Sequence, residues 1–443
     1  MLLLLTTGAE AGARLAGTLL PRGFFLGLGL TYLAALAVDR LAARWRVPGA
    51  AAVLLLGLAI PNDLLTHSQP LGPTLLETLH RVSLALLLFY AGLRTDLRRI
   101  RGIKAAGLGL GTLSLLITVL ITGLALYWLA PALPGGLPPA AVWLGVWCLA
   151  ATDSGALEDL LEALRHSVSG RLRHLLEFEA ALSTVMALLG FGFAAAVLQG
   201  QPHGEHQALH AALSSRLPQQ LGALALHVLA GLSAGVAVGA LAPRLIDRLV
   251  RSDQQLLLVA VALAFVAHGF GQWLGGGGLL AVFLAGVCLS NGDYHINRFE
   301  SQALGRVMQP FNTAAELTVL LLLGLMVKPE ALLTVLPVGL GLALVLPLAR
   351  VVGVWLVLRP PAFARSDRLI VAGCGLRAAV PLALAVSLTE ELPHLRGIAA
   401  TAVEPLASQL LALICVVVLL DLVLQPLAMR QLLAAISARR RLA

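Results

Sequence analysis

The sequence of 443 residues carries little charge: Asp, Glu, Lys and Arg make up 12% of it, whereas a soluble globular chain carries about 25%. Hydrophobic residues reach 58%, so a soluble protein of this composition could not cover its surface with polar groups. Intrinsic disorder and coiled coils are excluded as well, because both need many more charged residues. The four cysteines form no CxxC pair, which argues against a disulfide framework or a zinc site. These absences indicate an integral membrane protein.

Long apolar runs dominate the sequence instead. A helix that crosses a bilayer needs about 20 mainly apolar residues. Thirteen runs come close to this length, some of them shortened or broken, and they predict an all-α polytopic membrane protein with about 13 transmembrane helices. The candidate spans are residues 20–38, 48–65, 79–93, 105–130, 139–163, 174–199, 221–243, 254–273, 277–290, 307–327, 331–358, 369–388 and 407–429.

The basic residues alternate along the chain in a way that supports these spans. Alternate connections hold 23 of the 31 Lys and Arg residues, the other connections hold six, and Arg350 and Arg377 lie inside spans. Cytoplasmic loops of membrane proteins carry an excess of Lys and Arg. The sequence therefore predicts a cytoplasmic C-terminus and an external N-terminus. These loops also explain the formal charge of +8, so no nucleic-acid partner is expected.

Asp153 is the most informative ionisable residue within a span. It lies in residues 148–155 (CLAATDSG), where Thr, Ser and Gly favour a locally unwound helix that exposes oxygen atoms to a cavity. A carboxylate in such a place can hold a monovalent cation or a proton, and each excludes the other. We therefore expect an ion site at Asp153. The alternative is a carboxylate that only satisfies polar groups of a neighbouring helix.

Arg377 lies in a second interrupted span, residues 373–381 (GCGLRAAVP). An arginine keeps its proton and therefore needs an acidic partner inside a membrane. Glu179, in the sixth span, is the expected partner, and the pair is expected to hold two helices together. Arg350 is expected to reach the membrane surface with its long side chain, and Asp421 has no assigned role.

A short internal echo relates the two halves of the chain. Residues 86–93 (LLLFYAGL) resemble residues 320–325 (LLLLGL), and the two copies run in opposite directions across the membrane. Two spans after each copy comes an interrupted span, which contains Asp153 in the first half and Arg377 in the second. Inverted repeats with crossed discontinuous helices are the architecture of many secondary transporters.

Four stretches, in this order, resemble the monovalent cation:proton antiporter superfamily, the bacterial sodium/proton and potassium/proton exchangers. They are residues 89–97 (FYAGLRTDL), 151–153 (ATD), 279–286 (LLAVFLAG) and 375–382 (GLRAAVPL), and the resemblance covers nearly the whole chain. It implies a single membrane transport domain over residues 1–443, in which a mobile core moves like an elevator against a dimerisation domain. The core would comprise residues of about 79–199 and 307–388, and the dimerisation helices residues of about 20–65, 221–290 and 407–429.

The resemblance also implies roles for individual residues. Thr152 and Asp153 match the family's ion-site pair, and Glu179 and Arg377 match its structural salt bridge. A few residues after this glutamate the family usually has Asn-Asp or Asp-Asp, whose aspartate carries ions and protons. This chain departs from that pattern.

Ser183 and Thr184 follow Glu179 instead, so two hydroxyl groups are the expected neutral ligands. The resemblance implies exchange of Na+ or K+ for protons by a homodimer in a lipid bilayer, most simply a prokaryotic plasma membrane, without a cofactor. With Asp153 as the sole carrier, the exchange would be electroneutral. Glu316, in the tenth span, is either a second titratable group or a structural partner of polar neighbours.

Two other functions remain open. A channel-like or regulatory relative would bind the cation without moving protons, and the missing aspartate motivates this alternative. A membrane-embedded enzyme would need a metal cluster or a nucleophile with its base. Glu158, Asp159 and Glu162 are the nearest acidic cluster, and they are more simply explained as counter-charges to nearby arginines.

Overall fold

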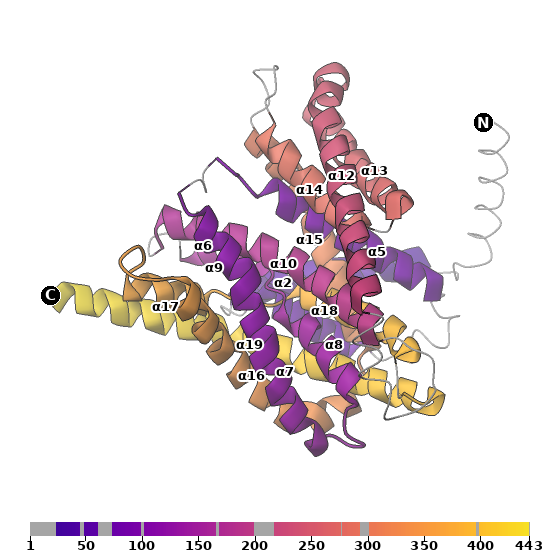
Figure 1. Ribbon diagram of the computed structural model, residues 1–443, viewed down its shortest axis with the longest axis vertical. Coiled ribbons are helices and arrows are strands. Elements are labelled where there is room, and N and C mark those ends of the chain that lie inside the picture. Colours follow the sequence, from indigo (N-terminus) through magenta and orange to yellow (C-terminus); the bar gives the residue numbers. More distant parts are fainter. Residues whose placement is uncertain are drawn as a thin grey trace.

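The computed structural model describes residues 24–44, 48–60, 73–98, 102–164, 168–198, 217–275, 277–292, 301–395 and 398–442. These residues fold almost entirely into helices (Figure 1), which confirms the predicted all-α fold. The first half contains α2 (Phe24–Arg44), α3 (Gly49–Ala59), α5 (Pro73–Leu93), α6 (Lys104–Gly109), η1 (Leu110–Ser114), α7 (Leu115–Leu129), η2 (Ala130–Ala132), α8 (Pro139–Ala150), α9 (Ser154–Ala163) and α10 (Gly170–Leu198). The second half contains α12 (Leu217–Leu249), α13 (Asp253–Gly275), α14 (Gly278–Asn291), α15 (Ser301–Met326), α16 (Pro329–Val357), α17 (Arg365–Gly373), α18 (Ala379–Glu391), η4 (Leu392–His394) and α19 (Ala400–Leu442).

Each of the thirteen candidate spans overlaps a helix or a broken helix in these ranges. Among the described residues, eight helices are long and apolar enough to cross a membrane on their own, and three shorter apolar helices accompany them. The number of thirteen crossings stays a prediction. Both predicted interruptions are confirmed, because α8 and α9 are separated at residues 151–153, and α17 and α18 at residues 374–378.

The local sequence explains where these two helices break. Ala151 and Asp153 have extended backbones, with ψ angles of 133° and 124°. Asp153 then caps the start of α9, a position at which aspartate is favoured. In the second break, Ala378 leaves the helical region with φ −144° and ψ −110°. Pro381 follows in the first turn of α18, where its missing N–H costs no helical hydrogen bond.

The helices pack in two groups. The first group is α2, α3, α5 and α12 to α15, and the second group is α6 to α10 and α16 to α19. In Figure 1, α12, α13 and α14 lie at the top, and α7, α16 and α19 lie at the bottom. Both broken helices belong to the second group, so the crossing of their ends lies inside one packed unit.

This packing divides the chain differently from the expected partition at three helices. Helices α5 and α15, expected in the core, pack mainly against α3 and α14 of the first group. Helix α19, expected among the dimerisation helices, packs against α16 and α18 of the second group. Which group moves and which forms a dimer stays a prediction.

Two of the stretches that carry the family resemblance pack directly on each other. Gly92 of α5 and Gly286 of α14 lie where the two backbones touch: a methyl group added at Gly92 would lie 2.2 Å from the carbonyl oxygen of Phe283, and one added at Gly286 would lie 2.5 Å from that of Phe89. Glycines at such positions allow two membrane helices to approach closely. The contact fixes α5 within the first group.

A substitution at Gly92 is expected to weaken this group. In Gly92→Ala the new methyl group meets backbone rather than a flexible side chain, so the helices must separate, which costs about 1–3 kcal/mol. Gly269→Ala on α13 is the matched control, because nothing lies within 4 Å of its added methyl group. The measurement is the thermal unfolding of the detergent-purified variants. Equal melting temperatures for the two variants would contradict this packing.

Candidate functional site

The ends of the two broken helices meet at Asp153. Its Oδ1 accepts hydrogen bonds from the backbone N–H groups of Gly155 (2.8 Å) and Ala156 (3.2 Å) at the start of α9. Its Oδ2 accepts one from Val380 N (3.0 Å) at the start of α18. The side chain is buried, with 3% of the residue exposed. One carboxylate therefore occupies the positive ends of two half-helices, where a negative charge is favoured.

Helix α10 is hydrogen-bonded to the same break through the side chains of Thr152, Ser183 and Thr184. The hydroxyl of Thr184 donates to the carbonyl oxygens of Thr152 and Ala180, both at 2.9 Å. The Ser183 hydroxyl contacts the Thr152 hydroxyl and donates to Ala180 O (2.9 Å). The three expected ligands are thus buried together with Asp153. Their hydroxyl groups hold the extended segment in place.

Arg377 binds the opposite ends of the half-helices. Its Nε donates to Leu149 O (2.6 Å) in the last turn of α8, and its Nη1 donates to Gly375 O (3.1 Å) just after α17. Its ion-pair partner is Asp421 of α19, with 3.3 Å between Nη1 and Oδ2, and its backbone N–H donates to the same oxygen at 3.1 Å. A positive charge is favoured at these carbonyl ends. Asp153 and Arg377 together therefore compensate all four half-helices.

The expectation that Glu179 forms a salt bridge with Arg377 is wrong. Glu179 forms a two-pronged ion pair with Arg350 of α16, with distances of 3.0 Å and 2.8 Å. Arg350 is 5% exposed, so the expectation that it reaches the membrane surface is wrong as well. The reason is tertiary: α16 passes α10 and α17, and Arg350 also donates to Val371 O (3.3 Å) at the end of α17. Asp421, which had no assigned role, is the partner of Arg377.

A cavity of about 480 Å³ lies beside the crossing and has many carboxylates in its wall. Gly155 and Glu316 both line it. A methyl group added at Gly155 would lie 3.1 Å from Glu316 Oε2 and 3.3 Å from Asp153 Oδ1. The two carboxylates therefore face each other across the space that the missing side chain leaves. The other carboxylates of the wall are Asp39, Glu158, Asp159 and Glu162.

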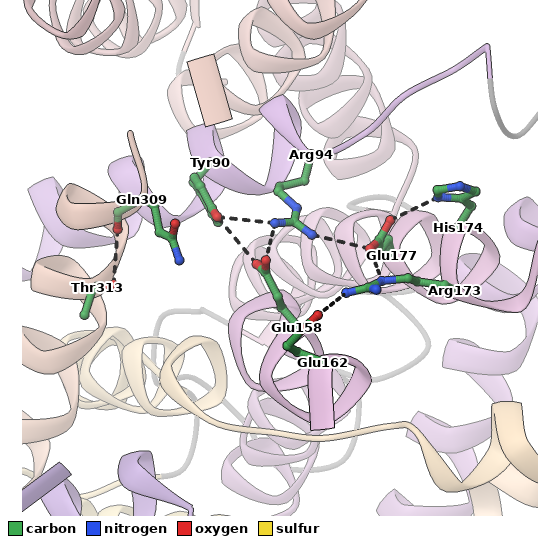
Figure 2. A network of polar contacts seen from close by, with 9 residues as sticks. All are labelled: Tyr90, Arg94, Glu158, Glu162, Arg173, His174, Glu177, Gln309 and Thr313. Carbon is green, nitrogen blue, oxygen red and sulfur yellow. Dashed lines mark hydrogen bonds and ion pairs between the residues drawn. The ribbon is translucent and has the colours of Figure 1, made fainter. Parts of the chain in front are cut away.

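A network of ion pairs lies next to this cavity (Figure 2). Arg94, at the end of α5, pairs with Glu158 of α9 and with Glu177 of α10, the latter at 3.4 Å. Arg173 holds Glu177 (3.3 Å) and Glu162 (3.4 Å) within the second group. Burial lowers the pKa of Arg94 more than any single neighbour raises it, but Glu158, Tyr90 and Glu177 together raise it by more, so Arg94 remains charged. Glu158 and Glu162 thus have arginine counter-charges, as expected, although Arg94 was not among those expected.

This arrangement can bind a small cation or a proton at one place. Asp153 has no ion-pair partner among the residues that the structure describes, whereas Glu179 and Asp421 are both occupied by arginines. In the described part of the chain, no three His, Cys, Asp or Glu side chains form a cluster suited to a metal ion such as zinc. Sequence reasoning correctly placed Asp153 at a helix break, and its role as an ion site stays a prediction; the pairing of the arginines and the role of Asp421 were missed.

Comparisons with known proteins bear on the family and the fold of this chain. The sequence profile of the family described as sodium/hydrogen exchanger, transmembrane, matches residues 29–435. The chain is 27% identical over 380 residues to the K(+)/H(+) antiporter NhaP of Alkalimonas amylolytica, covering 84% of this chain and 61% of that protein. It is 30% identical over 373 residues to the K(+)/H(+) antiporter NhaP2 of Shewanella oneidensis, covering 82% of this chain and 60% of that protein. The chain thus spans about 60% of the length of these relatives.

Its fold is similar to a solved structure, that of the sodium proton antiporter MjNhaP1 from Methanocaldococcus jannaschii at pH 8. The TM-score is 0.75 at 19% sequence identity, and the match covers 92% of this chain and 97% of that chain. Together with the eight long apolar helices, this likeness makes the chain a multi-pass integral membrane protein with an antiporter fold.

Proposed function

Because the chain belongs to the sodium/hydrogen exchanger family, we propose that it exchanges a monovalent cation, Na+ or K+, for protons across the membrane. The observation that carries the proposal is the position of Asp153, a buried carboxylate that has no ion-pair partner among the described residues and lies at the meeting point of two broken helices. The two relatives named above are K(+)/H(+) antiporters and the structural neighbour is a sodium proton antiporter, so both cations are candidates.

Binding of a proton and binding of a cation exclude each other at Asp153. The carboxylate is negative when it releases its proton, and a cation then compensates that charge, with Thr152, Ser183 and Thr184 as the proposed neighbouring oxygen ligands. One cation replaces one proton, so the exchange is electroneutral. Coupling follows because the unloaded, negatively charged site is costly to move through the membrane.

The two helix groups suggest how the site reaches both sides. Asp153 lies in the second group, and the polar contacts of that group with the first include Arg94 with Glu158 and Glu177, Tyr90 with Glu158, and His80 Nε2 with Ser387 Oγ at 3.2 Å. We therefore propose that the second group moves against the first, as in an elevator, and breaks these contacts. The first group would form the homodimer interface in the lipid bilayer.

The arginine-rich connections give the proposed orientation. Tyr90, next to Arg94, lines the carboxylate cavity, so this cavity lies towards the end of α5 that is expected in the cytoplasm. The structure is then an inward-facing state in a prokaryotic plasma membrane. An external N-terminus is part of the same proposal, but residues 1–23 lie outside the described residues.

A proton-flux measurement on purified protein in liposomes tests the proposed exchange. A pH gradient is imposed, and Na+, K+ and Li+ are added in turn. Exchange is expected to dissipate the gradient with Na+ or K+, and the responding ion identifies the substrate. If no cation moves protons through folded, inserted protein, the proposal fails. Cation binding without proton coupling would take its place, consistent with the hydroxyls of Ser183 and Thr184 where the family resemblance implies an aspartate.

The elevator proposal predicts a population shift in Arg94→Gln. The ion pairs of Arg94 are partly exposed, so their loss is expected to cost the inward-facing state about 0.5–1 kcal/mol, a two- to fivefold change in population. The readout is the rate at which a membrane-impermeant maleimide labels Thr313→Cys, an exposed residue of the cavity wall. Labelling from the cytoplasmic face is expected to slow.

Arg306→Gln is the matched control, because Arg306 is an exposed arginine on α15 near the same network. Labelling at the wild-type rate is expected in this variant. An equal slowing in both variants would show that only the local positive charge matters, and would contradict a role of Arg94 between the groups.

A further inference from the structure

Glu316 is a carboxylate of the first helix group that lies close to Asp153 of the second group. Its Oε2 and Asp153 Oδ1 lie 3.1 Å and 3.3 Å from one point, the place where Gly155 lacks a side chain. Glu316 has no ion-pair partner among the described residues. A cation or proton that leaves Asp153 for the cavity therefore meets a second carboxylate at once.

The packing of α15 separates the roles of the two carboxylates. Helix α15 packs against α3 and α5 in the first group, with Gly324 against Gly57 at a backbone contact, whereas Asp153 lies in the second group. If the groups move relative to each other, Glu316 does not travel with Asp153. A carboxylate that moved with Asp153 could carry a further proton and so change the number of protons exchanged per cation. A carboxylate that remains with the first group can act only while Asp153 faces the cavity.

We propose that Glu316 is a handover carboxylate, which rests on the exchange proposed above. It holds the cation or proton between Asp153 and the cavity while the groups are arranged as they are here, and it is left behind when the site faces the other side. The cation enters from the wall carboxylates Asp39 and Asp159, and passes Glu316 to reach Asp153. Glu158 and Glu162 contribute less, because Arg94 and Arg173 offset their charges.

The charge of Glu316 is therefore expected to matter at one face only. In Glu316→Gln the approaching cation loses one nearby negative charge in a poorly screened cavity, so the cation concentration for half-maximal exchange is expected to rise at least about fivefold at the cavity face. At the opposite face the change is expected to stay below about twofold, since Glu316 is then distant from the site. Glu316→Asp keeps the charge and should recover part of the loss.

The experiment measures Na+- and K+-driven proton flux in everted and right-side-out vesicles. The face from which Thr313→Cys is labelled identifies the side of the cavity. Gly155→Ala is the comparison variant: its added methyl group lies 3.3 Å from Asp153 Oδ1 and travels with Asp153 in the second group, so any effect it has on cation binding is expected at both faces, in contrast to Glu316→Gln. Thermal unfolding of each purified variant shows whether it folds.

Each outcome decides the matter. In Glu316→Gln, a rise in the cation concentration for half-maximal exchange at the cavity face alone supports the handover. An equal rise at both faces means that Glu316 acts wherever Asp153 goes, and no rise at either face means that the two carboxylates do not share an ion; both outcomes overturn the proposal. If the wild type shows no cation-driven flux at all, the exchange itself fails, and the handover falls with it.

Discussion

Asp153→Asn is expected to reduce cation-driven proton flux to the level of protein-free liposomes, at every pH and for every cation. The amide of asparagine has no proton to exchange in this range and no charge to offset a cation. Because the other buried carboxylates of the crossing, Glu179 and Asp421, are held by Arg350 and Arg377, neither is available as a substitute. The measurement is dissipation of an imposed pH gradient in proteoliposomes.

The same variant is expected to fold. Asparagine is as good a helix N-cap as aspartate, so its oxygen can still accept from Gly155 N and Ala156 N. Its amide NH2 group would replace Oδ2 opposite Val380 N, which loses one hydrogen bond and costs about 1 kcal/mol. A monodisperse protein with a slightly lower melting temperature is therefore expected.

Thr184→Val is the control for local damage, because it removes a hydroxyl that binds backbone carbonyls and leaves the carboxylate in place. Reduced but measurable flux is expected from it. Flux at the wild-type rate in Asp153→Asn would contradict the assignment of Asp153 as the shared site. Glu316 would then be the next candidate for that site.

Arg377→Ala is expected to have the largest effect on stability. It leaves the Asp421 carboxylate buried without its partner, and it removes the donor from the carbonyl oxygens of Leu149 and Gly375 at two helix ends. Breaking a buried ion pair on one side costs about 3–5 kcal/mol. A large loss of monodisperse protein, or a strongly lowered melting temperature in detergent, is the expected readout.

Double variants distinguish the pairing seen here from the pairing expected from the sequence. Arg377→Ala with Asp421→Leu should be less harmful than the two single effects combined, with a coupling energy of about 0.5–3 kcal/mol. Arg377→Ala with Glu179→Leu should show no such coupling, because Glu179 is bound to Arg350. Equal coupling in both pairs would refute the assignment of partners.

Much of the fold follows from local features that a single chain displays. Apolar runs, basic connections and the polar interruptions at Asp153 and Arg377 each report on their own segment, because a bilayer excludes polar groups residue by residue. The break in each helix was predictable for the same reason: Thr, Ser, Gly and Pro change backbone preferences where they stand. The two glycines at the contact between α5 and α14 also lie within two of the stretches that resemble the family.

The partners of charges were not predictable in this way. Two buried arginines and two buried acids allow two pairings, and residue types alone do not separate them. The choice depends on which helices cross: α16 brings Arg350 to Glu179, and α19 brings Asp421 to Arg377. Likewise, the sequence shows that Glu316 is inside a span, but not that α15 packs with the first group and presents it beside Gly155.

The sequence by itself determined that this protein is a helical membrane protein with two interrupted helices, and it pointed to Asp153 as the central carboxylate. These properties depend on the free energy of transferring each segment from water to lipid, which is set by the residues of that segment alone. Only the tertiary structure decided which arginine neutralises which acid, which helices form one packed group, and that a second carboxylate faces the site from the other group. Such contacts join residues far apart in the chain, and they exist only once the helices have packed.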